Sequence, residues 1–162
     1  MTELLIIYGL TLEDIDNGTV VARPPAPAAE PQYTNLPDIY TPSTWPSKSN
    51  RLCYYCGNQF TCYPKFIPFD MLPDGTCKPF GNFHTWECAA AYAVLHMPTQ
   101  AVDLLYNIAC MRSTIEKHPR HQVLPAPDYT TQKRYSGAAG LTAEEYNREL
   151  ERISKVSKTL HF

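Results

Sequence analysis

The sequence predicts an α+β fold of modest size, and three observations support this class. Closely spaced cysteines occur before and after a stretch that alternates aromatic and polar residues around the turn signal "LPDGT" at 72–76. Such alternation predicts a β-hairpin, while one-sided apolar stripes after residue 85 predict helices. The 162 residues suffice for one domain with extensions, because domains commonly contain about 100 to 150 residues.

The first fifty residues differ in composition from the rest. Residues 1–22 hold a short apolar run, residues 4–8, followed by an acidic and apolar stretch, which predicts a strand or a docking peptide. Residues 23–50 are rich in proline, which cannot sustain a helix and favours an extended path. We interpret residues 23–50 as a linker, or as an arm that wraps over the domain or over a partner.

The pair Cys53 and Cys56 admits three chemical readings: half of a disulfide, a redox dithiol, or one side of a metal site. The chain begins without a secretory signal and contains no run of roughly 18 apolar residues, so we expect a soluble, intracellular protein. In a reducing compartment, thiols serve as metal ligands or buried apolar groups more often than as disulfides. A redox dithiol opens a helix after a strand, and this pair does not. We therefore interpret the pair as half of a metal site.

A hairpin and a helix follow the pair. The alternating pattern predicts strands over residues 59–67 and 76–80. A helix is predicted over 86–96, because the hydroxyl of Thr85 can cap its first turn and Pro98 disfavours helical backbone at the residue before it. The hairpin thus separates the cysteine pair from a helix N-terminus.

The helix N-terminus supplies the other half of the predicted metal site. His84 and Cys88 are four residues apart and are expected on the same side of the first turn. Together with Cys53 and Cys56 they form a closed tetrahedral shell for one structural Zn²⁺, and Cys62 is the substitute ligand if His84 fails. A knuckle, a hairpin and a helix N-terminus around one ion form a treble-clef zinc finger.

Further helices are predicted to extend this finger. Residues 51–97 form the zinc unit, and residues 98–162 form a helical extension with one helix that ends near Pro119. Thr142 and Glu145 have the spacing of a capping box, which predicts the start of the last helix. In the loop between these two helices, the histidines of "HPRH" at 118–121 are expected to be solvated.

The charge pattern limits the partners. The formal net charge of −2 argues against a protein that binds nucleic acid over its whole surface. Local contacts with a partner or with nucleic acid remain open, although for the last helix a solvated face is the alternative. The candidate basic residues are Arg51, Lys65, Lys78, Arg148, Arg152 and Lys155.

No catalytic constellation is recognisable in the sequence. A closed four-ligand shell leaves no coordination position for an activated water, and Glu87 has no evident partner for general-base chemistry. We therefore predict that the chain is not an enzyme and has no small-molecule substrate and no membrane partner.

Two stretches resemble a known family. "CYYCGNQF…PFGNFHTWECAAAY" resembles the FCS-type (MYM-like) zinc finger, in which Phe83 matches the phenylalanine, Thr85 the serine and Cys88 the last cysteine. This sequence departs from the pattern at His84, where the family commonly has cysteine. The stretch "KRYSGAAGLTAEEYNREL" at 133–150 is similar to one group of these proteins, the poxvirus-type late transcription factor two family of nucleocytoplasmic large DNA viruses.

The resemblance implies a viral late-gene transactivator. Such a protein would contact the viral transcription machinery, DNA weakly, or both, in the host cytoplasm or viral factory. The alternative is a zinc-stabilised minor structural protein, packaged in the virion, that bridges larger viral proteins. The resemblance covers residues 53–150, so it predicts nothing about the N-terminal fifty residues.

Overall fold

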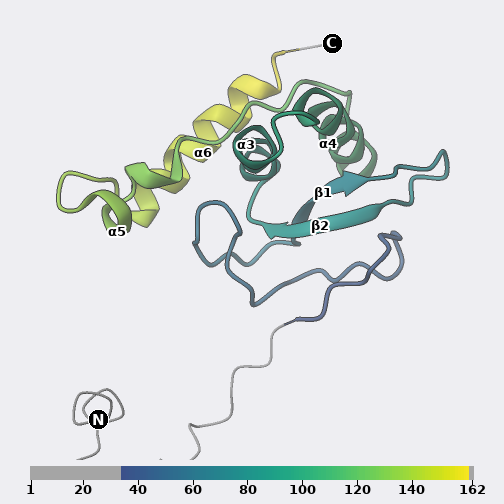
Figure 1. Ribbon diagram of the computed structural model, residues 1–162, viewed down its shortest axis with the longest axis horizontal. Coiled ribbons are helices and arrows are strands. Elements are labelled where there is room, and N and C mark those ends of the chain that lie inside the picture. Colours follow the sequence, from purple (N-terminus) through teal and green to yellow (C-terminus); the bar gives the residue numbers. More distant parts are fainter. Residues whose placement is uncertain (1–33, 161–162) are drawn as a thin grey trace, which may run out of the picture. The chain divides into compact units, whose positions relative to one another are not determined.

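A computed structural model describes residues 34–160, which hold a two-stranded hairpin and several helices (Figure 1). Residues 1–33 lie outside this range, and with them the predicted segment 1–22 and the beginning of the proline-rich region. The elements are β1 (Lys65–Phe69), β2 (Lys78–Phe83), α3 (Trp86–His96), α4 (Ala101–Glu116), the 3₁₀ turn η1 (Tyr129–Thr131), α5 (Lys133–Ser136) and α6 (Ala143–Ser157).

The hairpin is antiparallel and lies at the centre of the described part of the chain. Ile67 pairs with Phe80, and the register shifts between the pairs at Lys65 and Ile67. Nearly all of β1 is buried, while the first four residues of β2 alternate between exposed and half-buried. Both strands begin later than the sequence predicts, since residues 59–64 form loop rather than ladder. The mixed α and β content agrees with the predicted class.

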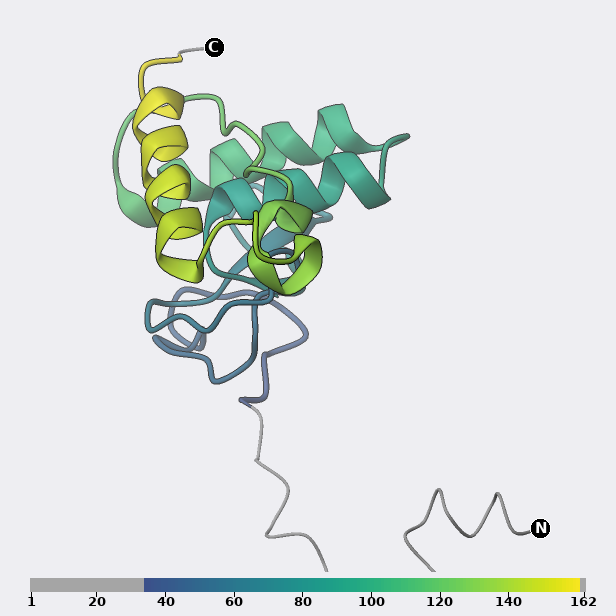
Figure 2. The same cartoon turned by 90° about the vertical axis from the view of Figure 1, so that its left-hand side faces the viewer.

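Helices α3 and α4 cover one face of the hairpin, and α6 lies against α3 (Figures 1 and 2). Helix α3 has the predicted bounds, and Thr85 caps it by accepting a hydrogen bond from the Cys88 N–H at 3.1 Å. Small side chains such as Ala89 and Ala93 are fully buried, which lets neighbouring elements approach α3 closely. The N-terminus of α3 is therefore deep in the core.

The opposite face of the hairpin is covered by residues 34–50, which were expected to be a linker or an arm (Figure 1). The rings of Tyr40 and Trp45 lie 4.9 and 4.8 Å from the ring of Phe66, measured between centroids. The indole N–H of Trp45 also donates to the carbonyl of Pro64 at 2.9 Å. Of the alternatives left open for residues 23–50, an arm that wraps over the domain fits residues 34–50.

The C-terminal helix begins as predicted. Thr142 and Glu145 make both hydrogen bonds of the capping box, which stabilises the first turn of α6. Tyr146 and Leu150 are buried, whereas Val156 is exposed, so only the first part of the apolar stripe enters the core. No helix among the residues described is long and apolar enough to span a membrane.

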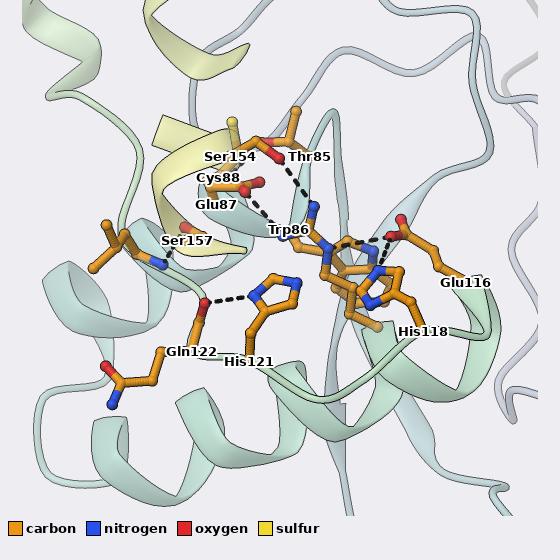
Figure 3. A network of polar contacts seen from close by, with 12 residues as sticks. Thr85, Trp86, Glu87, Cys88, Glu116, His118, His121, Gln122, Ser154 and Ser157 are labelled. Carbon is orange, nitrogen blue, oxygen red and sulfur yellow. Dashed lines mark hydrogen bonds and ion pairs between the residues drawn. The ribbon is translucent and has the colours of Figure 1, made fainter. Parts of the chain in front are cut away.

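A buried ion-pair network joins three helices (Figure 3). The Arg112 guanidinium on α4 donates to Glu87 on α3 at 2.9 Å, to Glu116 at 3.2 Å and to Ser154 on α6 at 2.9 Å. The side chains of Arg112 and Glu87 are 6% and 2% exposed, so both charges depend on each other for compensation. The network fixes α6 against the start of α3.

The loop after α4 differs from expectation at one histidine. His118 is half-buried and contacts Glu116 at 2.9 Å, while His121 is only 4% exposed and its ring stacks on that of His118. The position of the two histidines beside a proline in a loop predicts solvated rings. The imidazole of His121 is instead buried, where its Nδ1 contacts the carbonyl of Gln122 at 2.8 Å (Figure 3).

Candidate metal centre

Three cysteines converge beside the N-terminus of α3. The Sγ atoms of Cys53, Cys56 and Cys88 all lie within 4.8 Å of one another, and the three residues are between 0% and 3% exposed. Cys53 and Cys56 come from the loop that precedes the hairpin, and Cys88 comes from the first turn of α3. The cluster therefore ties together two segments that the hairpin separates in sequence.

A tight turn presents the first two thiols. We call residues 53–58 the knuckle. The Gly57 N–H donates to the carbonyl of Cys53 at 3.0 Å, and the Cys53 N–H donates to the carbonyl of Asn58 at 3.1 Å. Gly57 has φ of +75°, which L side chains rarely adopt, so the sequence places glycine where the turn requires it. The two thiols thus point to the same side.

The ionisation of the three thiols is interdependent. Burial opposes ionisation of Cys53, yet hydrogen bonds from the thiols of Cys56 and Cys88 outweigh it and hold the pKa of Cys53 well below its usual value. The hydrogen bond to Cys53 raises the pKa of Cys56 to about 12, and burial raises the pKa of Cys88 well above its usual range. A metal ion that binds all three sulfurs must therefore displace the protons of Cys56 and Cys88.

The backbone of His84 is close enough to Cys53 to help lower the pKa of its thiol. Its ring stacks on Phe60, with centroids 5.5 Å apart, and is not part of the group of ligand atoms within 4.8 Å. The spacing argument assumed helical geometry for His84, but the helix cap is Thr85 in extended conformation, so His84 precedes the helix. Ligation by His84 therefore stays a prediction.

The ring of His84 carries an unsatisfied atom. Its Nδ1 is buried and has no hydrogen-bond partner in the described part of the chain, and a buried polar atom without a partner is costly. Cys62, the substitute ligand, is exposed, donates weakly to the carbonyl of His84 at 3.6 Å and is not in the cluster. Three clustered, buried thiols are ligands that suit Zn²⁺, and an unpartnered imidazole nitrogen is a donor of the type that could complete the set.

The candidate basic residues lie on separate elements. Lys65 is 7% exposed, with its ammonium 3.2 Å from Cys62 Sγ and 4.0 Å from the ring centre of Tyr63, and its contact with a partner stays a prediction. Lys78 pairs with Asp70 at 3.4 Å beside the hairpin turn.

The other four candidates differ in their surroundings. Arg51 donates to the carbonyl of Thr34 at 2.7 Å, and Arg152 pairs with Glu149 on α6 at 3.0 Å. Arg148 and Lys155 are exposed on α6. Contact with a partner or with nucleic acid stays a prediction for these four residues and for Lys78.

The structure adds two residues to the centre that the sequence did not single out. Gln132 donates to the carbonyl of Cys56 at 2.8 Å, and Arg134 donates to the carbonyl of Gly57 at 2.8 Å. They come from the region of η1 and α5, more than seventy residues downstream. No local spacing could have revealed them, since they lie so far along the chain from the groups that they contact.

Metal content distinguishes the two candidates for the fourth ligand. We expect one Zn²⁺ per chain in wild type and its loss in Cys53→Ser, because three buried thiolates supply most of the binding. His84→Ala should weaken zinc binding, while Cys62→Ser should leave it unchanged. Mass spectrometry on protein purified without added metal, followed by chelator competition, measures both. If His84→Ala kept full affinity for zinc and Cys62→Ser lost it, Cys62 rather than His84 would be the fourth ligand.

The comparisons with known proteins yield one group of relatives. The chain is similar to Uncharacterized protein B175L of African swine fever virus, with 27% identity over 138 residues in isolate Tick/South Africa/Pretoriuskop Pr4/1996, which covers 78% of this chain and 74% of the relative. The protein of the same name from isolate Pig/Kenya/KEN-50/1950 is 27% identical over 132 residues, covering 74% and 71%. No family model and no solved structure matches. The chain is therefore similar to viral proteins whose name states no activity.

Proposed function

We propose that this chain is a non-enzymatic zinc-binding protein of a large DNA virus that acts in late transcription by contacting the transcription machinery. The observation that carries the metal part is the cluster of Cys53, Cys56 and Cys88. The role in transcription is supported by the family resemblance of residues 53–150, and the viral origin by the similarity to African swine fever virus proteins.

In this proposal one Zn²⁺ is bound by the three cysteines and His84 in a treble-clef arrangement. The ring of His84 reaches the ion by leaving its stack on Phe60, which would also give its buried Nδ1 a partner. Zinc would supply no reaction chemistry here. It would hold the knuckle against the start of α3, which is the function of a closed structural site.

The buried position of the centre supports a structural rather than a catalytic ion. Catalytic zinc keeps an open coordination position that substrate can reach. In this chain the three sulfurs lie in the core, where Tyr146 and Trp86 are also buried. An interaction protein with a metal-stabilised core fits this arrangement better than an enzyme does.

The exposed side chains favour protein partners over direct reading of DNA bases. Large apolar side chains are exposed on several elements, and aromatic residues are common in protein interfaces. The basic candidates are in part engaged with neighbouring acids, so we expect only weak, salt-dependent binding to DNA. The most exposed apolar residues are Leu52, Tyr54, Leu72, Leu95, Val102, Tyr106 and Tyr135.

Conditional depletion in the virus that encodes this chain tests the transcriptional role. We expect late mRNA to fall while early mRNA is unchanged, and Cys53→Ser to fail to restore late mRNA. Thr114→Ser, on the exposed side of α4, is the matched control and should restore it. Normal late mRNA in depleted cells, with the protein present at fixed stoichiometry in purified particles, would favour the structural role instead.

A further inference from the structure

The region from η1 to the start of α6 is folded onto the back of the knuckle. We call residues 129–141 the clasp. Within the clasp, the Lys133 N–H donates to the carbonyl of Leu141 at 2.8 Å, and the Leu141 N–H donates to the carbonyl of Thr131 at 2.8 Å. These bonds close the segment into a compact loop that contains α5, drawn in light green in Figure 2. The clasp is thus a defined unit with its own backbone pairing.

Two side chains of the clasp donate hydrogen bonds to backbone carbonyls of the knuckle. Gln132 is 2% exposed, and its Nε2 donates to the carbonyl of Cys56 at 2.8 Å. The guanidinium of Arg134 bridges the carbonyl of Gly57 at 2.8 Å and Oδ1 of Asn58 at 2.6 Å. A buried carbonyl needs a partner, and a guanidinium holds two acceptors in fixed geometry. The peptide planes that orient the Cys56 thiol are therefore fixed by the clasp.

Two side chains of the clasp approach Gly57 closely. A Cβ at this position would lie 2.9 Å from the hydroxyl of Tyr135 and 3.1 Å from Arg134. Next to it, the ring of Tyr55 meets that of Tyr129 edge to face, with centroids 5.3 Å apart. The absence of a side chain at Gly57 thus serves two needs, the positive φ and the close approach of the clasp.

A second glycine is needed to close the clasp itself. A Cβ on Gly140 would meet Oγ of Ser136 and, at 2.7 Å, the backbone nitrogen of Lys133. Gly140 contributes no atom to the knuckle contacts. Its replacement would disturb the clasp without changing any group that touches the metal centre.

We propose that the clasp is an outer layer of the zinc centre. Gln132 and Arg134 raise the affinity of the centre for Zn²⁺, and bound Zn²⁺ in turn favours docking of the clasp on the knuckle. This inference rests on the proposed zinc site. It also gives residues 133–141, which begin the stretch that resembles the viral family, a structural role at the metal centre. Because linkage is reciprocal, a clasp that favours the zinc-bound knuckle is itself favoured by zinc.

The expected size follows from other metal sites. Loss of a residue that orients a ligand from outside typically lowers metal affinity by about 10- to 100-fold. We expect the dissociation constant of Zn²⁺ to rise by that factor in Gln132→Ala and in Arg134→Gln. Gly140→Ala should also raise the dissociation constant of Zn²⁺. Arg148→Gln, which removes an exposed arginine of α6 with no role at the knuckle, should stay within about twofold of wild type.

The experiment is chelator competition with Zn²⁺ on the full chain, with thermal unfolding of the zinc-loaded form measured in parallel. Arg134 is exposed, so Arg134→Gln decides the matter if Gln132→Ala fails to fold. If wild type binds zinc and Arg134→Gln binds it with unchanged affinity, the proposed role of the clasp is wrong, even if the thermal midpoint falls. The proposal of a zinc site would not be affected by that result. No zinc binding in wild type would overturn the metal centre and the clasp together.

Discussion

Cys88→Ser is expected to abolish zinc binding and to unfold the domain at room temperature. Cys88 is fully buried in the first turn of α3, and its sulfur is one of three that would bind the ion. Structural zinc contributes roughly 10 to 16 kcal/mol in zinc-finger peptides, whereas a native domain has a net stability of only about 5 to 15 kcal/mol. Circular dichroism and metal analysis of the purified variant measure both effects.

Cys110→Ser is the matched control for this prediction. Cys110 is a half-buried thiol on α4 outside the cluster, and its sulfur is 3.2 Å from Arg120. We expect this variant to keep one Zn²⁺ and a native spectrum. Removal of zinc from wild type by a chelator should reproduce the spectrum of Cys88→Ser. A folded Cys88→Ser protein with a wild-type thermal midpoint would show that the ion, if bound, does not hold the core.

The second large effect is expected for Arg112→Met. This change leaves the carboxylate of Glu87 buried without its partner, and breaking a buried ion pair costs about 3 to 5 kcal/mol. The contact from α4 to Ser154 on α6 is lost as well. Urea denaturation of the zinc-loaded protein gives the free energy of unfolding. We expect the urea concentration at the midpoint to fall, while the dependence of the free energy of unfolding on urea concentration stays the same.

Two further variants separate the cause of this loss. Glu87→Leu combined with Arg112→Met removes both charges, and such replacements are often neutral or stabilising, so most of the stability should return. Arg152→Met breaks the exposed pair with Glu149 and should cost less than about 1 kcal/mol. If Arg112→Met cost no more than Arg152→Met, the buried pair would not be what fixes α6.

The parts of the fold that the sequence predicted well depend on local signals. The bounds of α3 follow from the capping hydroxyl of Thr85 and from Pro98, and the start of α6 follows from its capping box. The proximity of Cys53 and Cys56 also follows from short spacing. Each of these predictions needs only residues a few positions apart, so local chemistry was sufficient.

The parts that the sequence predicted poorly depend on distant neighbours. Proline content indicates an extended path for residues 34–50, but only the presence of Phe66 makes that path pack on the hairpin. Lys65 and His121 were judged by polarity, while their burial is decided by residues that the fold brings over them. For His84, the spacing rule assumes helical backbone, but this residue precedes the helix cap, so its ligation stays a prediction.

The long separation between knuckle and clasp has a kinetic consequence during synthesis. Gln132 is 76 residues after Cys56, and a ribosome adds about 5 to 20 residues per second, so the knuckle precedes its clasp by roughly 4 to 15 s. During that interval the thiols of the nascent chain lack the groups that we propose to strengthen their hold on zinc. A ribosome that stalls just before residue 134 would thus leave the thiols of Cys53, Cys56 and Cys88 without the complete clasp, open to oxidation or to the wrong metal.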